Sequence, residues 1–186
     1  MAETRVASRY VKSLLGLAVE QNAVDAVHND MLLFAKVADE NRAFALILKN
    51  PIIRHEKKRD ILDKLFKGKV HPLTLAIFDI ITRKNREGIL IDISKQFHNA
   101  YNVYKGIGKA TVTTAVPIDA ALRAEFGEMV KKISDKKEIE LIEKVDADMI
   151  GGFVLNVGDR QIDASMKNKL KALKVKFSYN PYIKEL

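Results

Sequence analysis

The chain has 186 residues, of which 47% are hydrophobic and 30% are charged, and its formal net charge is +8. This length and composition suit one large globular domain or two small ones. The absence of cysteine excludes a disulfide framework and any cysteine metal ligand or nucleophile, and no run of the sequence approaches the ~20 apolar residues that span a bilayer.

The first expected element is a helix from about Thr4 to Gln21. Its apolar residues cover roughly half of the helix circumference, which is more than a single core contact requires. Either one flank is buried in the chain's own core while the other binds a partner, or the helix is wedged between two of its neighbours; the pattern leaves both open. The apolar positions follow two lines: Val6, Tyr10, Leu14 and Leu17, and Ala7, Val11, Leu15 and Ala18.

Three further helices are expected before residue 70. The second runs from about Val24 to Asp39, and a short third ends at Asn50, because Pro51 disfavours helix in the residue before it. The fourth covers Arg54 to Phe66 and begins with the charged run Arg54–Arg59, which we expect to be a solvated face.

The segment after Pro72 is apolar in nearly every helical direction. A strand is possible by composition, but a helix is favoured because Pro suits the first helical position and the pattern continues to Arg86 without a break. A helix that is apolar all round has to be covered all round, which is difficult in a domain of ~100 residues without surface from another chain. The first and fifth helices are therefore expected to carry more apolar surface than a small helical domain needs.

A sixth helix is expected from Ile89 to Tyr104, before Gly106 and Gly108 change the pattern. A strand over Thr111–Val116 and a helix capped by Asp119 follow. That helix is expected to turn five residues inward: Leu122, Phe126, Met129, Val130 and Ile133. A half-exposed strand follows, in which Ile139, Leu141 and Val145 alternate with charged residues.

The stretch from Ile150 to Leu173 is the most informative part of the chain. It begins with strand-forming residues over Phe153–Val157, turns at Gly158-Asp159-Arg160, and returns in a short strand over Gln161–Asp163. A helix follows, for which Ser165 and Asp163 offer capping oxygens. Met166, Leu170 and Leu173 recur at helical spacing, so they are expected to face the sheet while the neighbouring lysines stay solvated.

No residue pattern indicates catalysis, a cofactor or a metal. The four histidines, His28, His55, His71 and His98, lack metal-ligand spacing and are interpreted as surface or packing residues. Gly151-Gly152 lacks the Lys-Ser/Thr of a phosphate loop and precedes a strand. Asp159 and Asp163 are a possible carboxylate pair, although a turn and a helix cap explain both.

A basic nucleic-acid-binding module is the alternative reading of the charge. Against it, the 32 basic residues are mixed with 24 acidic ones along the whole chain, whereas phosphate binding requires basic residues gathered on one face. The densest basic group, Lys167–Lys176, is interpreted as the exposed side of an amphipathic helix.

The order of elements predicts an α+β fold with two domains. We expect an N-terminal six-helix bundle over residues 1–105 and a small β-α-β-β-α domain over residues 106–186, because helices segregated from a small sheet imply separate layers.

The sequence resembles the delta subunit of F-type ATP synthases, a relative of the mitochondrial oligomycin-sensitivity-conferring protein, nearly from end to end. The resemblance begins with Ala7–Leu14, continues at Asn50-Pro51 with Lys57 or Lys58, and includes Lys84-Asn85-Arg86 with Ile89, where the spacing differs from the family's. Its most specific part is the C-terminal signature, which consists of Gly151, Gly152, Gly158, Asp159, Ile162, Asp163, Ser165 and Leu170.

This resemblance implies a non-catalytic stator subunit without a cofactor. In the family, the first and fifth helices form a groove that holds the N-terminal helix of an α subunit of the catalytic head, and the second domain binds the b subunits of the peripheral stalk. The subunit thereby keeps the head from turning with the rotor during proton-driven ATP synthesis. Carried onto this sequence, the expected groove residues are Tyr10, Leu14, Leu17, Ile77, Phe78 and Ile81.

The resemblance further implies a monomer within a larger complex that binds neither nucleic acid nor, directly, the membrane. The N-terminus carries Glu3 and no apolar core typical of a secretory signal. We therefore expect a peripheral location on the cytoplasmic face of a bacterial inner membrane.

Overall fold

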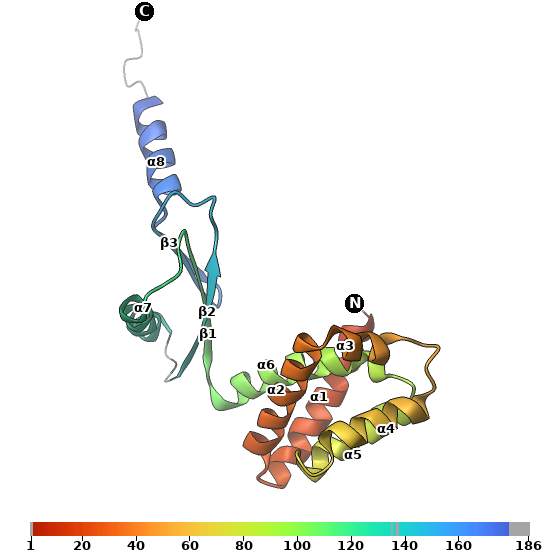
Figure 1. The fold of residues 1–186 in the computed structure, drawn as a ribbon. Helices are drawn as coiled ribbons and strands as arrows, with labels where there is room; N and C mark the ends of the chain where they lie inside the picture. The colour runs from red at the N-terminus through yellow and green to blue at the C-terminus, as the bar shows by residue number, and fades with distance from the viewer. Residues whose placement is uncertain (1, 135, 137, 179–186) are drawn as a thin grey trace, which may run out of the picture. The chain divides into compact units, whose positions relative to one another are not determined.

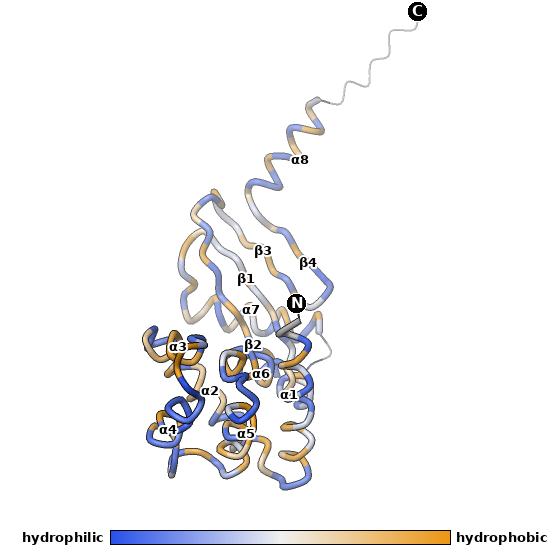
Figure 2. Tube along the Cα trace, turned by 90° about the vertical axis from the view of Figure 1, so that its right-hand side faces the viewer, coloured by the Kyte–Doolittle hydropathy of each residue, from blue (hydrophilic) through white to orange (hydrophobic). Residues whose placement is uncertain are grey.

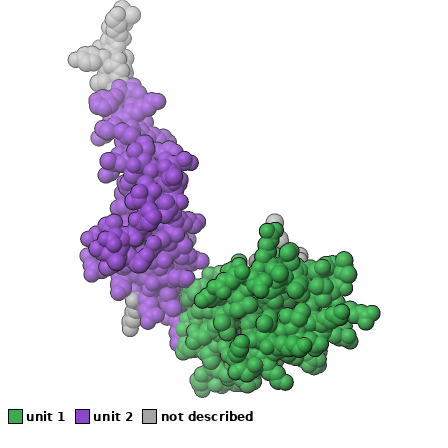
Figure 3. All heavy atoms as spheres, in the orientation of Figure 1, with its two compact units in different colours: residues 1–104 green, residues 105–186 purple. Residues whose placement is uncertain are grey.

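The computed structural model describes residues 2–134, 136 and 138–178, and these form two compact units, residues 1–104 and residues 105–186 (Figure 3). Within the described residues the chain has eight α-helices, one short 3-10 helix and a four-stranded sheet (Figure 1). The expected α+β class is therefore confirmed.

All regular secondary structure in the described part of the first unit is helical. Its helices lie near their expected ranges, although the fifth ends at Arg83 instead of continuing to Arg86. Asn41 caps the third helix by accepting a hydrogen bond from the Phe44 amide at 3.2 Å, and Pro72 is the first residue of the fifth. The elements are α1 (Ala2–Glu20), α2 (Val24–Glu40), α3 (Arg42–Lys49), α4 (His55–Phe66), α5 (Pro72–Arg83), η1 (Glu87–Ile89) and α6 (Leu90–Lys105).

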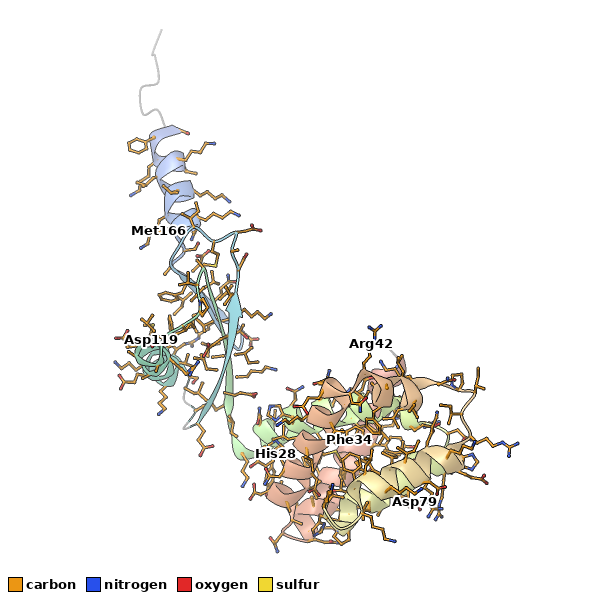
Figure 4. All side chains as sticks on the ribbon, viewed as in Figure 1. His28, Phe34, Arg42, Asp79, Asp119 and Met166 are labelled. Carbon is orange, nitrogen blue, oxygen red and sulfur yellow. The ribbon has the colours of Figure 1, made fainter. Side chains whose placement is uncertain are left out.

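Aromatic rings from four helices meet in the core of this unit. Phe34 of α2 lies between Phe44, Phe66 and Phe78, with ring centroids 5.1–5.9 Å apart. Tilted and edge-on contacts at these distances are favourable arrangements for aromatic pairs. The core is thus built by residues far apart in the chain, and Figure 4 shows Phe34 among the helices.

The expectation of a fully solvated Arg54–Arg59 run is wrong at one position. Lys58 is only 2% exposed, and its ammonium group donates to the Leu48 carbonyl oxygen at 3.0 Å and to Glu87 Oε1 at 2.5 Å. A buried lysine needs such partners because an unpaired charge in the interior is costly.

The second unit pairs its strands in the order β2-β1-β3-β4. Its elements are β1 (Gly108–Thr114), α7 (Ala120–Ile133), β2 (Ile139–Val145), β3 (Phe153–Val157), β4 (Arg160–Asp163) and α8 (Met166–Ser178). Strand β1 is parallel to β2 and antiparallel to β3. Ala110, Val112 and Leu155 point to one face of the sheet and pack against Phe126 and Val130 of α7.

The expected β-α-β-β-α order is wrong by one strand. Residues Arg160–Asp163 form β4, which pairs antiparallel with β3, so the order is β-α-β-β-β-α. All of the residues of β4 are exposed. This strand is the short second arm of a hairpin at the sheet edge. It confirms the return strand that the sequence predicts over Gln161–Asp163, which the β-α-β-β-α order left out.

The expected packing of α8 on the sheet is also wrong. Met166, Leu170 and Leu173 are 49%, 55% and 47% exposed, and none of the residues Met166–Ser178 is buried. In Figures 1 and 2, α8 extends beyond the ends of the strands instead of covering a face of the sheet. The remaining tail residues, 179–186, lie outside the described part of the chain.

Among the described residues, no helix combines the length and the hydropathy needed to cross a bilayer.

Candidate functional site

Helix α5 is positioned by a buried aspartate of α2. Asp30, which is 9% exposed, accepts hydrogen bonds at one oxygen from the His71 amide and from the Thr74 hydroxyl, both at 2.7 Å. His71 Nδ1 also accepts from the Leu73 amide at 3.3 Å. These bonds satisfy donors at the start of α5 and fix this end of the helix against α2.

Most of the expected groove residues lie in the core of the first unit. Leu14, Ile77, Phe78 and Ile81 are 1%, 7%, 3% and 0% exposed, so their side chains have almost no surface left for a partner. Tyr10 is half-buried, and Leu17 is 46% exposed.

Helices α1 and α5 are neighbours, and a contact of each with a third helix identifies one of its flanks. The Ser8–Leu15 flank of α1 lines a cavity with Gln96 and Ala100 of α6, and the Asp79 flank of α5 pairs with Arg59 of α4 at 2.9 Å. Figure 4 labels Asp79 on α5. On α1, helical spacing places Val6, Tyr10 and Leu17 on the side opposite the Ser8–Leu15 flank. On α5, Leu73 and Ile80 lie about a third of a turn from Asp79, between its flank and the buried Ile77 and Ile81.

We call the apolar residues at these positions the α1–α5 strip. Helical spacing groups them on one side of each helix, and they are Val6, Tyr10 and Leu17 of α1 with Leu73 and Ile80 of α5. Ile80 is 47% exposed. It was not among the expected groove residues, although the sequence shows it as one of the apolar residues of a helix that is apolar all round. The strip presents two exposed branched side chains on two neighbouring helices, which suits a partner's apolar face.

A pocket of about 560 Å³ lies where the N-terminal part of α1 approaches the segment that follows α5. It joins residues from α1, α3, α4, α6, η1 and the connecting segments. The lining residues are Val6, Leu48, Lys49, Pro51, Lys58, Asn85, Arg86, Glu87, Gly88, Ile89 and Asp92.

The wall of this pocket contains the buried Lys58–Glu87 pair. Both side chains are almost fully buried, at 3% and 7% exposure. Within the described part of the chain, Glu87 Oε2 has no hydrogen-bond partner, which is uncommon for a buried carboxylate oxygen. Lys49 and Arg86 are exposed on the same pocket, and among the described residues neither forms an ion pair.

Two histidines that are far apart in the sequence meet between α2 and α6. His28 Nε2 lies 2.9 Å from His98 Nδ1, and the His28 ring stacks on Tyr101 with centroids 3.7 Å apart. His28 is labelled in Figure 4. The structure therefore places these two histidines in a packing cluster. No group of three or more potential metal ligands occurs among the described residues.

The C-terminal signature residues shape the turn into α8. Gly152 has φ +82°, and a Cβ at this position would lie 2.4 Å from the Ala164 carbonyl oxygen. Gly158, with φ +56°, opens the turn of the β3–β4 hairpin, where Asp159 is exposed. Ile162 lies on the exposed β4, and Gly151 faces Met166.

Ser165 and Asp163 provide the expected caps for α8. The Ser165 hydroxyl accepts from the Asn168 amide at 3.2 Å, and Asp163 Oδ1 accepts from the Ser165 amide at 2.9 Å. Hydrogen bonds from the Ser165 side chain and backbone lower the pKa of Asp163. Both residues thus serve the helix start.

An apolar pocket of about 350 Å³ lies beside this turn. Val116, Leu122 and Ile150 line it and are 67%, 46% and 72% exposed. The expectation that Leu122 points inward is therefore wrong, and so is that for Met129, which is 36% exposed. The exposed apolar residues of α8 begin at Met166, next to Gly151 of the same pocket. The second unit therefore also offers apolar surface for a partner.

Comparison with known proteins gives one consistent family. A family model described as ATP synthase delta (OSCP) subunit matches residues 6–177. A protein named ATP synthase subunit delta from Cytophaga hutchinsonii is 42% identical over 178 residues, which cover 96% of this chain and 97% of the relative. Proteins of the same name from Christiangramia forsetii and Lactobacillus johnsonii are 36% and 33% identical, and the matches cover 100% and 94% of this chain and 100% and 95% of the relatives.

A chain in the cryo-EM structure of the Toxoplasma gondii mitochondrial ATP synthase hexamer has a similar fold. The TM-score is 0.74 at 19% identity, and the match covers 94% of this chain and 98% of that chain.

Proposed function

The chain belongs to the ATP synthase delta (OSCP) subunit family of F-type ATP synthases, and from this premise we propose that it is a non-catalytic stator subunit. It links the catalytic head to the peripheral stalk, so that the head does not turn with the rotor during proton-driven ATP synthesis. It thus works as a monomer within a hetero-oligomeric complex, held at the cytoplasmic face of a bacterial inner membrane through that complex.

The first unit binds the head by holding the N-terminal helix of an α subunit on the α1–α5 strip. The observation that carries this proposal is the exposure of Leu17 and Ile80, at 46% and 47%, on two neighbouring helices. Exposed apolar surface of this kind supports helix-in-groove recognition. The contact is assigned to the strip, with Tyr10 and Leu17 retained from the expected set, because Leu14, Ile77, Phe78 and Ile81 are committed to the core.

Titration calorimetry with a synthetic peptide of the α subunit's N-terminal segment tests this contact. Leu17→Asp places a charge on the strip and should weaken binding by at least tenfold, because a charge buried in an apolar interface is costly. Leu46→Asp is the matched control, since Leu46 of α3 is 57% exposed and lies outside the strip. Equal affinity of the Leu17→Asp variant and the wild-type protein would refute the contact.

The second unit binds the b subunits of the stalk through α8 and the adjoining pocket. Helix α8 carries lysines at positions 167, 169, 171, 174 and 176 and no acidic residue over Met166–Ser178, which supports a partner helix with an acidic polar face. Leu170→Asp should abolish capture of a C-terminal b-subunit fragment, whereas Leu32→Asp on α2, where the native leucine is 42% exposed, should not.

The relatives described above give no support to the nucleic-acid alternative, since all are named as ATP synthase subunits. A nucleic-acid module would bind DNA or RNA with an affinity that falls steeply with salt. The stator subunit should show no such binding in a filter-retention assay at about 150 mM salt.

A further inference from the structure

The pocket beside the Lys58–Glu87 pair lies at one end of the α1–α5 strip and gives that strip a direction. We propose that this pocket receives the first turn of the partner helix, so that the partner runs parallel to α1 and antiparallel to α5. The inference rests on the proposed head contact and adds to it the polarity of the bound helix and the chemistry that recognises its end.

Both helices of the strip lead to the pocket. Val6 belongs to the strip and also lines the pocket, while Leu17 lies at the opposite end of α1. The residues Asn85–Ile89, which begin two positions after the last residue of α5, form the other side. A helix lying along the strip therefore has one of its ends at this pocket.

The unpartnered carboxylate oxygen of Glu87 selects which end. Its Oε2 atom is buried and accepts no hydrogen bond within the described part of the chain, although Oε1 is held by Lys58. The first turn of a helix carries free N–H donors, whereas the last turn carries free carbonyl oxygens, which are acceptors. The first turn can therefore offer Oε2 a backbone donor, which the last turn cannot, and the carboxylate's terminal torsion is soft enough to present it to the pocket.

Two further features favour the same end. Helix α3 ends at Lys49 beside the pocket, so the partial negative charge of its C-terminus attracts the positive N-terminal end of another helix. Lys49 and Arg86 are exposed cations on the pocket without an ion pair among the described residues. Acidic side chains are favoured in the first turn of helices, and these two cations are placed to bind them.

The polarity can be measured by distance, since the chain has no native cysteine. A nitroxide is attached to the first residue of the α-subunit peptide, and a second one to a single cysteine in the full chain. One labelling site is Ile52→Cys, since Ile52 lies next to Pro51 of the pocket and is 87% exposed. The other is Gln21→Cys, since Gln21 lies just after the end of α1. From Val6 to Gln21 the helix spans roughly 22 Å, so electron–electron double resonance separates the two arrangements.

We expect the peptide's first residue to be closer to position 52 than to position 21. The reverse order in a peptide that still binds would overturn the polarity and leave the head contact standing. Loss of binding to the wild-type chain would instead refute the head contact itself.

The charge contact is tested separately. Arg86→Gln should weaken peptide binding about fivefold at low salt and much less at about 0.5 M salt. Arg42→Gln, at the far end of α3, where Figure 4 shows the side chain pointing outward, should leave affinity unchanged. Unchanged affinity of the Arg86→Gln variant would remove the carboxylate contact from the proposal.

Discussion

At the scale of single residues, Gly152 is a position without room for a side chain. Its φ of +82° disfavours any L-residue, and a Cβ would approach the Ala164 carbonyl oxygen to 2.4 Å. Gly152→Ala should therefore destabilise the second unit by ~3 kcal/mol. Amide hydrogen exchange at Leu155 and Val157 of β3 reports this loss.

Gly127→Ala is the matched control for that substitution. Gly127 lies within α7, where a Cβ added to the glycine would have no neighbouring side chain within 4 Å, and alanine is the better helix former by ~1 kcal/mol. This variant should exchange more slowly at the same amides. If both variants behaved alike, the strain at Gly152 would not be the cause.

The Lys58–Glu87 pair predicts a strongly non-additive pair of substitutions. Lys58→Met leaves the 6% exposed Glu87 without its cation and should cost ~3–5 kcal/mol, because an uncompensated buried charge remains. Adding Glu87→Leu should restore most of this loss. Hydrogen exchange at the Ile93 and Phe97 amides measures the stability of the single and the double variant. If the double variant lost the sum of the two single losses, the pairing would be contradicted.

Asp163 predicts a stability difference that depends on pH. Its hydrogen bonds with Ser165 lower its pKa in the folded chain, so the stabilisation is present above the unfolded pKa of ~3.9 and disappears as pH falls through the lowered folded value. Asp163→Asn should lower the melting temperature at about pH 6, and the difference from wild type should shrink toward about pH 2. A gap of constant size across this range would contradict the assignment.

Residues that act on their own neighbours were predictable from the sequence, and residues that act over long separations were not. Ser165 and Asp119 cap helices within three positions of themselves, which spacing can indicate. Asp30 holds the start of α5 from 41 and 44 positions away, and Lys58 meets Glu87 from 29. The pocket could not be predicted because these pairings exist only after the helices pack.

At the scale of elements, α8 predicts a helix whose order depends on a partner. It has 13 residues, none of them buried, and isolated helices of this length are marginal in water. In the free protein its amides should exchange much faster than those of α6, which buries Ile93 and Phe97. Bound stalk fragment should slow the exchange of α8; exchange that is already slow in the free chain would contradict this.

The same helix shows why element packing was harder to predict than element position. The start of α8 follows from Ser165, and its apolar residues recur with helical spacing. That spacing predicts an apolar face but not what covers it, so the expected contact with the sheet was wrong. On α5 the apolar residues all round the helix were expected to include surface left over for a partner, but most of these residues lie in the core.

At the scale of the whole molecule, the two compact units predict that the two partner contacts are separable. Residues 1–104 contain the α1–α5 strip and its pocket, while the apolar pocket and α8 belong to residues 105–186. Because each unit has its own hydrophobic core, a fragment of residues 1–104 should fold alone and bind the α-subunit peptide within about twofold of the full chain's affinity.

That fragment should also compete with the full chain in the assembled complex. It occupies the head but lacks the stalk contact, so it should uncouple the two without affecting ATP hydrolysis by the isolated head. Two contacts in series transmit torque only while both hold, and tethering raises the effective concentration of each when the other is bound. The full chain should therefore displace the fragment at far lower concentration than the reverse; equal potency would mean that the stalk contact contributes nothing to retention on the head.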